Sequence, residues 1–360
     1  MTQVTNDSPL TPRIVDGGPS LAFDLPGVLV GAAEYDEGPT GCTAVLLPPT
    51  ARVVADQRGG AVGFTGDYSA PDAICLAGGS LLGIEAAAGV AAELHASRGY
   101  TTEFLRMPAV SGAIIYDFHS RRTPVYPDKE LGRAAARGAR PRWFPLGTRG
   151  AGRAAGVGQG GAARRQGEVS VAVFTVVNAL GSVVDREGRV VYGGNRRPSP
   201  GAETRTLAEE LAARSLGPPP ARGSTTLTVV VTNATLGTYE LTQLGRQVHT
   251  SMARAIQPFH TPYDGDVLWA VTTRTGPTVD SMALGVLASE VAWDAVLGVW
   301  PERLARDLSS RCPRSWSCAE DRSEPISMGE RGPQKYGREM GCMGGKDPSA
   351  FSAGPLASAS

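Results

Sequence analysis

The stretch Gly223-Ser224-Thr225-Thr226-Leu227-Thr228-Val229-Val230-Val231-Thr232-Asn233 decides how this 360-residue chain is interpreted. A proline-rich loop ends there, and a strand of β-branched residues begins directly on two threonines. If the chain is cut before Thr225, that residue gains a free α-amine beside its own hydroxyl. Nucleophile and general base would then come from one residue, because an α-amine has an unperturbed pKa of about 7.7 to 8.0. The alternative is an ordinary threonine-rich strand edge.

The bulk composition excludes several classes of protein. The formal net charge is zero, from 35 basic and 35 acidic residues, so no global field attracts nucleic acid or an anionic membrane. The chain has no apolar run long enough to span a bilayer, and its start lacks a signal-peptide pattern. Its five cysteines form no CxxC pair, which favours free thiols in a reducing compartment. We therefore expect a cytoplasmic protein that binds neither nucleic acid nor membrane.

Motifs for a metal or an organic cofactor are missing from the sequence. The four histidines are scattered without close ligand spacing, so we expect surface or packed roles for His95, His119, His249 and His260. The run Gly78-Gly79-Ser80-Leu81-Leu82-Gly83 has serine where a dinucleotide-binding loop needs its second glycine, and no βαβ unit surrounds it. We predict that the protein uses neither metal nor cofactor.

Composition and periodicity divide the chain into three parts. Residues 1–22 are expected to be a flexible arm, residues 23–300 a single domain, and residues 301–360 a disordered tail. Within the domain, 169–177 reads as an apolar strand, 140–167 as loop and 196–224 as a processing loop. Apolar residues at three- and four-residue spacing predict an amphipathic helix through Leu241, Leu244, Val248, Met252 and Ile256.

A second motif, His260-Thr261-Pro262-Tyr263-Asp264-Gly265-Asp266, places two carboxylates two residues apart directly before a strand. On an extended backbone both would face one side. Such close carboxylates influence each other's ionisation, and the pair can orient and polarise a nucleophile that carries a hydroxyl and an amine. The alternative is an Asp-Gly turn with two solvated acids.

Many segments, in order from Phe23 to Leu297, carry a resemblance to a known family. They include GVLVGAAEYDEGPTG, RGGAVGFTG, AICLAGGSLLGIEAAAGV, AIIYDF, VYPDKELGRAA, GQGGAARR, the strand from Thr225, QVHTSMARAIQPFHTPYDGD and ASEVAWDAVL. The chain resembles the L-aminopeptidase/D-esterase family, peptidase family S58. Within it, the closest pattern is the nylon-oligomer endohydrolase branch, the 6-aminohexanoate-oligomer hydrolases.

The resemblance implies a precursor that cleaves itself and exposes an N-terminal nucleophile for amide hydrolysis. By this resemblance the cut lies between Ser224 and Thr225, and Thr225 is the nucleophile. Asp264 and Asp266 match the acidic residues that complete the nucleophile's network. Tyr116 matches an active-site tyrosine, and Asn178 matches an asparagine that donates a hydrogen bond to the oxyanion.

This sequence departs from the family pattern at two places. The endohydrolases carry asparagine before the nucleophile, whereas this chain has Ser224, so a cut between Gly223 and Ser224 stays open as an alternative. The family also has an active-site lysine after a Gly-Ala-rich segment, and that segment is shortened here. Lys129 lies in a different match, and Arg153 holds its proton too tightly to exchange it near neutrality.

The resemblance implies an α/β fold, a four-layer αββα sandwich of the self-processing aminopeptidase and ornithine acetyltransferase type. It implies a hydrolase of linear amide oligomers, assembled as a homo-oligomer, with a tetramer suspected, of processed protomers. An L-aminopeptidase/D-esterase or β-peptidyl aminopeptidase is one alternative, and it would need an acidic pocket for the free amine of its substrate. An uncleaved, inactive homologue with a binding or assembly role is the other, because of the missing lysine.

Overall fold

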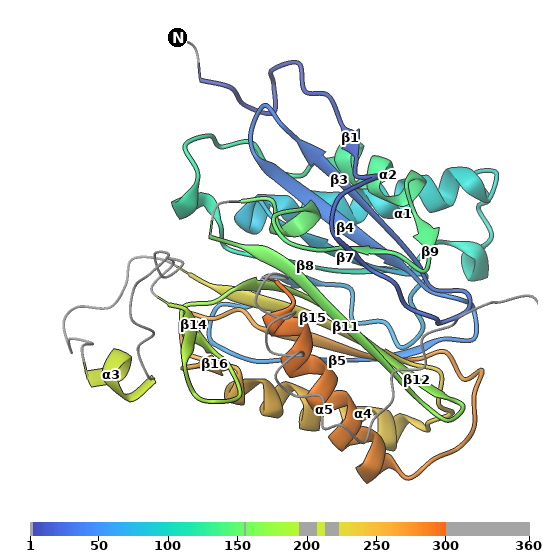
Figure 1. Ribbon diagram of the computed structural model, residues 1–360. Coiled ribbons are helices and arrows are strands. Elements are labelled where there is room, and N and C mark those ends of the chain that lie inside the picture. The colour runs from blue at the N-terminus through green and yellow to red at the C-terminus, as the bar shows by residue number, and fades with distance from the viewer. Residues whose placement is uncertain (1–2, 155, 194–206, 213–222, 300–360) are drawn as a thin grey trace, which may run out of the picture. The chain divides into compact units, whose positions relative to one another are not determined.

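Four layers of secondary structure make up the described part of the chain. The computed structural model describes residues 3–154, 156–193, 207–212 and 223–299. Two large sheets pack face to face, and helices cover the outer side of each (Figure 1). One apolar core lies between the two sheets. A second lies between the first sheet and its helices, and a third between the second sheet and its helices. This is the αββα arrangement expected from the resemblance.

The first sheet comes from the N-terminal half of the domain. Its strand order is β1-β3-β4-β7-β8-β6, and β9 pairs with β3. Helices α1 (Glu85–Ser97) and α2 (Lys129–Arg137) contribute to the core on its outer face. The strands are β1 (Arg13–Ile14), β3 (Leu29–Tyr35), β4 (Thr40–Leu46), β6 (Phe64–Thr65), β7 (Ala73–Ala77), β8 (Val110–Ile114) and β9 (Arg140–Pro141).

The second sheet carries the strand that begins at Thr225. Its order is β11-β12-β15-β17-β5, in which β15 and β17 run parallel and the other neighbours antiparallel. Helices α4 (Thr238–Ser251) and α5 (Ser281–Leu297) cover its outer face. The strands are β5 (Arg52–Gln57), β11 (Gly158–Gln166), β12 (Val169–Asn178), β15 (Thr225–Thr232) and β17 (Val267–Thr272).

Smaller elements complete the described part. Strand β2 pairs with β10, and β13 lies between β14 and β16. Their bounds are β2 (Ser20–Leu21), β10 (Phe144–Pro145), β13 (Ser182–Val184), β14 (Val190–Tyr192) and β16 (Ile256–Gln257). Helix α3 spans Leu207–Ala212, and short 3-10 helices span Ser80–Ile84, Phe104–Arg106, Phe118–Ser120, Gly150–Gly152 and Met252–Arg254.

Side-chain alternation along β15 sorts its residues between two cores. Leu227, Val229 and Val231 belong to the core between the sheets, whereas Val230 belongs to the core under α4 and α5. Successive side chains of a strand point to opposite faces. Thr225 therefore faces the space between the sheets, and Thr226 faces the helices.

The periodic pattern that predicted an amphipathic helix is confirmed by α4. Leu241, Leu244 and Val248 are buried against the second sheet and α5. The expected end differs, because Met252 lies in the following 3-10 turn and Ile256 begins β16. Asp280 caps the N-terminus of α5, and its carboxylate accepts hydrogen bonds from the backbone N–H groups of Met282 and Ala283.

Two sequence-based expectations differ from the structure. Part of the region expected to be a flexible arm is paired, because β1 joins β3 and β2 joins β10. The region 140–167, expected to be loop, contains the nine-residue strand β11. The glycines of β11 made the sequence look unlike a strand, because glycine is depleted in strands. Gly160 is nevertheless required, since a Cβ at this position would lie 2.0 Å from the carbonyl oxygen of Ala295 in α5. Close packing of helix on strand explains the composition.

Most of the expected processing loop, at 194–206 and 213–222, lies outside the described residues, as does the expected tail at 301–360. Among the residues that are described, no helix is both long and apolar enough to cross a membrane.

Candidate active site

The bond between Ser224 and Thr225 is intact in this structure and lies where β15 meets the segment before β17. The Thr225 hydroxyl donates a hydrogen bond to the carbonyl oxygen of Ser224, with 2.6 Å between the two oxygens. The same carbonyl oxygen accepts the backbone N–H of Gly265 at 2.9 Å. Since a carbonyl carbon lies about 1.23 Å from its oxygen, the hydroxyl oxygen lies within about 3.8 Å of the carbon it would attack. Both Ser224 and Thr225 are buried.

Gly265 has no side chain because none would fit. A Cβ there would lie 2.4 Å from the carbonyl oxygen of Ala61 and 3.0 Å from the Thr225 hydroxyl oxygen. Gly265 therefore faces the Thr225 side chain from the segment before β17. The Asp-Gly-Asp motif is not a solvated turn, because Asp264 and Asp266 are both buried.

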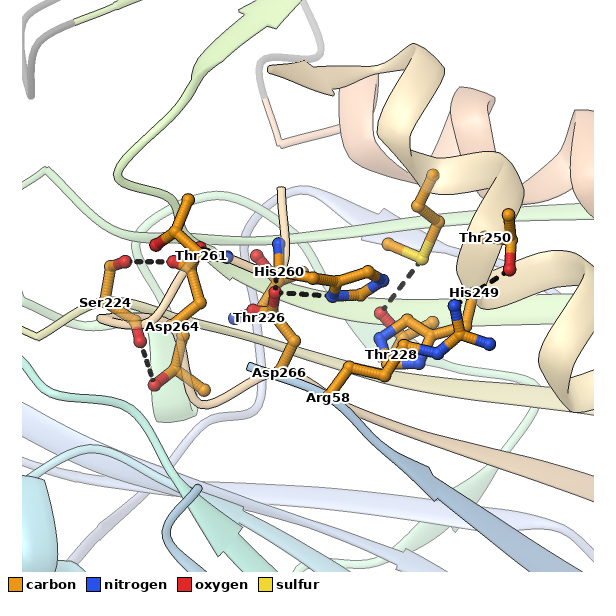
Figure 2. A network of polar contacts seen from close by, with 12 residues as sticks. Arg58, Ser224, Thr226, Thr228, His249, Thr250, His260, Thr261, Asp264 and Asp266 are labelled. Atoms are coloured by element: carbon orange, nitrogen blue, oxygen red, sulfur yellow. Dashed lines mark hydrogen bonds and ion pairs between the residues drawn. The ribbon is translucent and has the colours of Figure 1, made fainter. Parts of the chain in front are cut away.

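Asp264 holds the residue before the bond. The Ser224 hydroxyl donates a hydrogen bond to its carboxylate, and the backbone N–H of Thr261 donates to the other carboxylate oxygen at 2.7 Å. The backbone N–H of Ser224 donates to the carbonyl oxygen of Tyr263 at 3.0 Å. These contacts fix Ser224 through both its side chain and its backbone. Figure 2 shows the side-chain contact of Ser224 with Asp264.

Asp266 holds the residue after the nucleophile candidate. One of its carboxylate oxygens accepts the backbone N–H of Thr226 at 2.7 Å. The other lies 3.0 Å from Nδ1 of His260 and 3.3 Å from the backbone N of His260 (Figure 2). Burial raises the pKa of Asp266 to about 6, and the charge of Asp264 acts in the same direction, whereas the His260 contacts oppose the rise.

The two carboxylates and the Thr225 hydroxyl lie on different faces of the second sheet. In the parallel register Ser224 stands opposite Asp264 and Leu227 opposite Val267, which places Thr226 opposite Asp266. By alternation these acids share the helix-facing side with Thr226, while Thr225 and Gly265 face the other sheet. The structure brings Asp264 and Asp266 to the bond, where their hydrogen bonds go to the neighbours of Thr225.

Asn178 and Tyr116 lie on the same side as the Thr225 hydroxyl. Asn178 is the direct cross-strand partner of Thr225 on β12, so their side chains share a face. Its side-chain amide donates to the backbone carbonyl oxygen of Tyr116 at 2.8 Å. An amide nitrogen has two hydrogens, so one N–H is available for a reacting oxyanion. The Tyr116 ring lies against Gly223, where a Cβ would be 3.0 Å from its Cγ.

Neither basic residue considered for the missing lysine reaches this site. Arg153 forms ion pairs with Glu34 at 3.4 Å and with Asp36 at 3.4 Å. Lys129 is exposed at the start of α2, in the outer helix layer of the first sheet. The described part of the site therefore contains no side-chain amine.

Sequence reasoning missed two contributors to the site. It assigned His260 no role, although its place in the His-Thr-Pro-Tyr-Asp-Gly-Asp motif was a signal, and it did not single out the Gly265 N–H. Across the described ranges no group of His, Cys, Asp or Glu side chains is arranged to hold a metal ion.

Comparison with known proteins agrees with the fold and the motifs. The model of "Peptidase family S58" matches residues 21–298. A putative NylC-analogous protein from Agromyces sp. strain KY5R is 46% identical over 302 residues, covering 77% of this chain and 98% of that protein. A 6-aminohexanoate-oligomer endohydrolase from Kocuria sp. strain KY2 is 45% identical over 313 residues, covering 80% of this chain and 88% of that enzyme.

Among solved structures, an L-aminopeptidase D-Ala-esterase/amidase from Ochrobactrum anthropi, described as a variant of the Ntn hydrolase fold, superposes with a TM-score of 0.56. Its sequence is 17% identical, and the match covers 78% of this chain and 85% of that chain. The fold is thus that of the N-terminal nucleophile hydrolases. The chain belongs to peptidase family S58 and is a hydrolase, so the resemblance and the fold class inferred from the sequence are confirmed.

The raised pKa of Asp266 predicts a pH-dependent stability difference between the wild-type side chain and Asp266→Asn. A carboxyl that binds its proton more tightly when folded stabilises the fold below its unfolded pKa of about 4, and loses that contribution as the pH rises through about 6. Between pH 4 and pH 7, the unfolding free energy of the aspartate form should fall by about 2 kcal/mol relative to the asparagine form. Urea titrations at both pH values measure this difference.

Both proteins in that comparison should carry Thr225→Val, which removes the hydroxyl beside the 224–225 bond and so the group that the family resemblance implies for self-cleavage. A stability difference that stays constant between the two pH values would show that Asp266 ionises as it does in water.

Proposed function

We propose that the chain cleaves itself between Ser224 and Thr225 and that Thr225 then hydrolyses linear amide oligomers, such as those of 6-aminohexanoate. The observation that carries this proposal is the Ser224 carbonyl, which meets the Thr225 hydroxyl at 2.6 Å and the Gly265 N–H at 2.9 Å. The N–H distance suits a donor that stabilises an oxyanion. The alternative cut between Gly223 and Ser224 is less favoured, because the Ser224 hydroxyl is bound to Asp264.

The self-cleavage proceeds in two steps. The Thr225 Oγ attacks the carbonyl carbon of Ser224, and the oxyanion that forms is held by the Gly265 N–H. The bond from that carbon to the Thr225 nitrogen then breaks, the nitrogen takes up the hydroxyl proton, and an ester remains. Water hydrolyses the ester, which releases a carboxylate at Ser224 and leaves Thr225 with a free hydroxyl and a free amine. The products are residues 1–224 and 225–360.

The acids position the bond from the helix-facing side. Asp264 holds Ser224, and Asp266 holds the N–H of Thr226, so the chain is fixed on both sides of Thr225. Asn178 faces the hydroxyl from the neighbouring strand and supplies an amide donor for the oxyanion of the substrate reaction. Tyr116 lines the approach through its ring and holds Asn178 through its carbonyl oxygen.

In the processed protein the amine of Thr225 serves as the general base. It removes the proton of its own hydroxyl, which attacks the substrate amide and forms an acyl-enzyme that water resolves. No lysine is required for this step, because an α-amine is partly neutral near pH 8. The substrate class follows from the relatives at 45% identity that are named 6-aminohexanoate-oligomer endohydrolases.

Location and assembly belong to the same proposal. A cytoplasmic location is supported by Cys42 and Cys75, which are buried free thiols. A homo-oligomer, with four protomers as the working number, is supported by large apolar side chains that are exposed in the single chain: Leu81, Leu82, Phe104 and Leu105.

Thr225→Val should give a single 360-residue chain without amidase activity, because valine keeps the shape of threonine and lacks its hydroxyl. Thr225→Ser, the matched control, should still be cut and should hydrolyse substrate. Denaturing electrophoresis and amine release from 6-aminohexanoate oligomers measure the two outcomes. A valine variant that is processed at the same bond would refute the assigned nucleophile.

Asn178→Ala should lower kcat per processed site by about 10² to 10³, the typical cost of losing one oxyanion donor. Asn233→Ala is the control, since Asn233 lies beyond the far end of β15 and bonds to Ser170 and Glu168. It should leave kcat within about twofold. Initial rates on separated, processed enzyme test this, and an unchanged kcat for Asn178→Ala would remove this residue from the reaction.

Oligomers with an acetylated N-terminus should be cut as readily as free ones. The carboxylates of Asp264 and Asp266 lie on the helix-facing side of the second sheet and are hydrogen-bonded to Ser224 and Thr226. Neither carboxylate is therefore placed to bind a substrate ammonium group between the sheets. Product analysis by chromatography distinguishes the modes: cleavage restricted to oligomers with a free amine would identify an aminopeptidase instead.

A further inference from the structure

A chain of polar side chains lies behind Asp266 on the helix-facing side of the second sheet. The imidazole of His260 contacts Asp266, and its ring meets the ring of His249 edge to face with 4.4 Å between centroids. His249 projects from α4, and its Nδ1 lies 2.8 Å from the carboxylate of Asp56 in β5. Arg58 donates to the same carboxylate at 2.8 Å, and its guanidinium also donates to Thr250 of α4 (Figure 2). Three separate segments thus meet behind one carboxylate: the segment from His260 to Asp266, helix α4, and the end of β5 with Arg58.

The backbone of His260 is held in an unfavourable conformation at this point. Its φ is +59°, in the left-handed region that residues other than glycine uncommonly adopt, although histidine, like asparagine, does so more often than most. Both the backbone N–H and Nδ1 of this residue are directed at the same oxygen of Asp266. Such a conformation persists only where its surroundings fix it, and it is found preferentially at functional sites.

The two histidines contact different carboxylates, His249 that of Asp56 and His260 that of Asp266. Burial lowers the pKa of His249 to about 4, against the effect of Asp56, so its imidazole is neutral at pH 7. The carboxylate of Asp56 forms an ion pair with the guanidinium of Arg58. Among the described residues bonded to Asp266, only His260 can present a protonated nitrogen from a side chain. The like charge of Asp264 on the same short segment makes this contact more important.

We propose that His260 is a positioning residue for the self-cleaving and hydrolytic site. It donates a hydrogen bond from Nδ1 to Asp266 and thereby keeps the carboxylate ionised and aligned on the N–H of Thr226. Thr226 directly follows the nucleophile, so this contact fixes where β15 begins and where the Thr225 hydroxyl points. His249, held by Asp56, supports the ring of His260. The role of His260 in activity rests on the proposed function, whereas its hydrogen bond to Asp266 does not.

The first test reads the hydrogen bond without activity. In the uncut Thr225→Val chain, ¹⁵N NMR of the imidazoles should show the neutral form of His260 with its proton on Nδ1. Asp266→Asn in the same background should move this signal. A neutral His260 that carries its proton on Nε2 would overturn the proposal, whether or not the protein is an enzyme.

The second test uses the pH profile of kcat/KM for processed enzyme. His260→Ala removes the donor, so Asp266 should bind its proton more tightly and the acidic limb should move to higher pH by about one unit. His260→Asn accepts a positive φ and offers an amide donor, so its limb should stay near that of the wild type. His95→Ala, in the helix layer of the first sheet, is the control and should not move it.

The groups that could also shape this limb are Asp264, His249, Asp56, Arg58 and the α-amine of Thr225, the proposed general base, whose own step should lie above that of Asp266 and be common to all variants. None of them is altered in the three variants. Equal shifts for His260→Ala and His260→Asn, or no shift for either, would contradict a positioning role. Wild-type protein that neither cuts itself nor hydrolyses amides would defeat the proposed function, and the NMR test would still decide the His260 contact.

Discussion

The parallel pairing between the start of β15 and the segment before β17 is the constraint on which the site depends. Through this pairing Ser224 stands beside Asp264, and the N–H of Gly265 points at the carbonyl oxygen of Ser224. A shift of one residue would turn every side chain of β15 to the opposite face. The valines of β15, buried in two different cores, oppose such a shift. Packing of the β15 side chains thus fixes the register between β15 and the segment before β17. That register in turn fixes which groups lie beside the Ser224–Thr225 bond.

This register also places the Thr225 hydroxyl and the two carboxylates on opposite faces of the second sheet. The Thr225 hydroxyl and its cross-strand partner Asn178 face the space between the sheets. The buried acids face the helices and hold the chain on either side. A charged carboxylate directly against the hydroxyl is therefore not needed to place it. This arrangement explains why two carboxylates lie close to the Thr225 hydroxyl while their hydrogen bonds go to Ser224 and Thr226.

Residues with strong local signals were predictable from the sequence, and those defined by long-range packing were not. The β-branched run after Thr225 and the spacing of Leu241, Leu244 and Val248 predicted their strand and helix, because burial of one face imposes those periods. Strand β11 was missed, since Gly160 is selected by the closeness of α5 rather than by strand propensity. Residues 13–14 were missed as a strand because two residues carry no periodicity.

The site residues divide in the same way. Asp264, Asp266, Asn178 and Tyr116 were identified through the family resemblance, and the structure gathers them around the Ser224–Thr225 bond. The face on which each acid lies could not be read from the motif, because it follows from the register with β15. The role of His260 was equally hidden, since its contact depends on a positive φ and on His249, which comes from α4.

The most direct test of this account is the intact mass of the purified wild-type protein, with N-terminal sequencing of every fragment. The account predicts two polypeptides that remain associated in native buffer, one of which begins at Thr225. A single polypeptide with the mass of all 360 residues, or a new terminus at any residue other than Thr225, would contradict it.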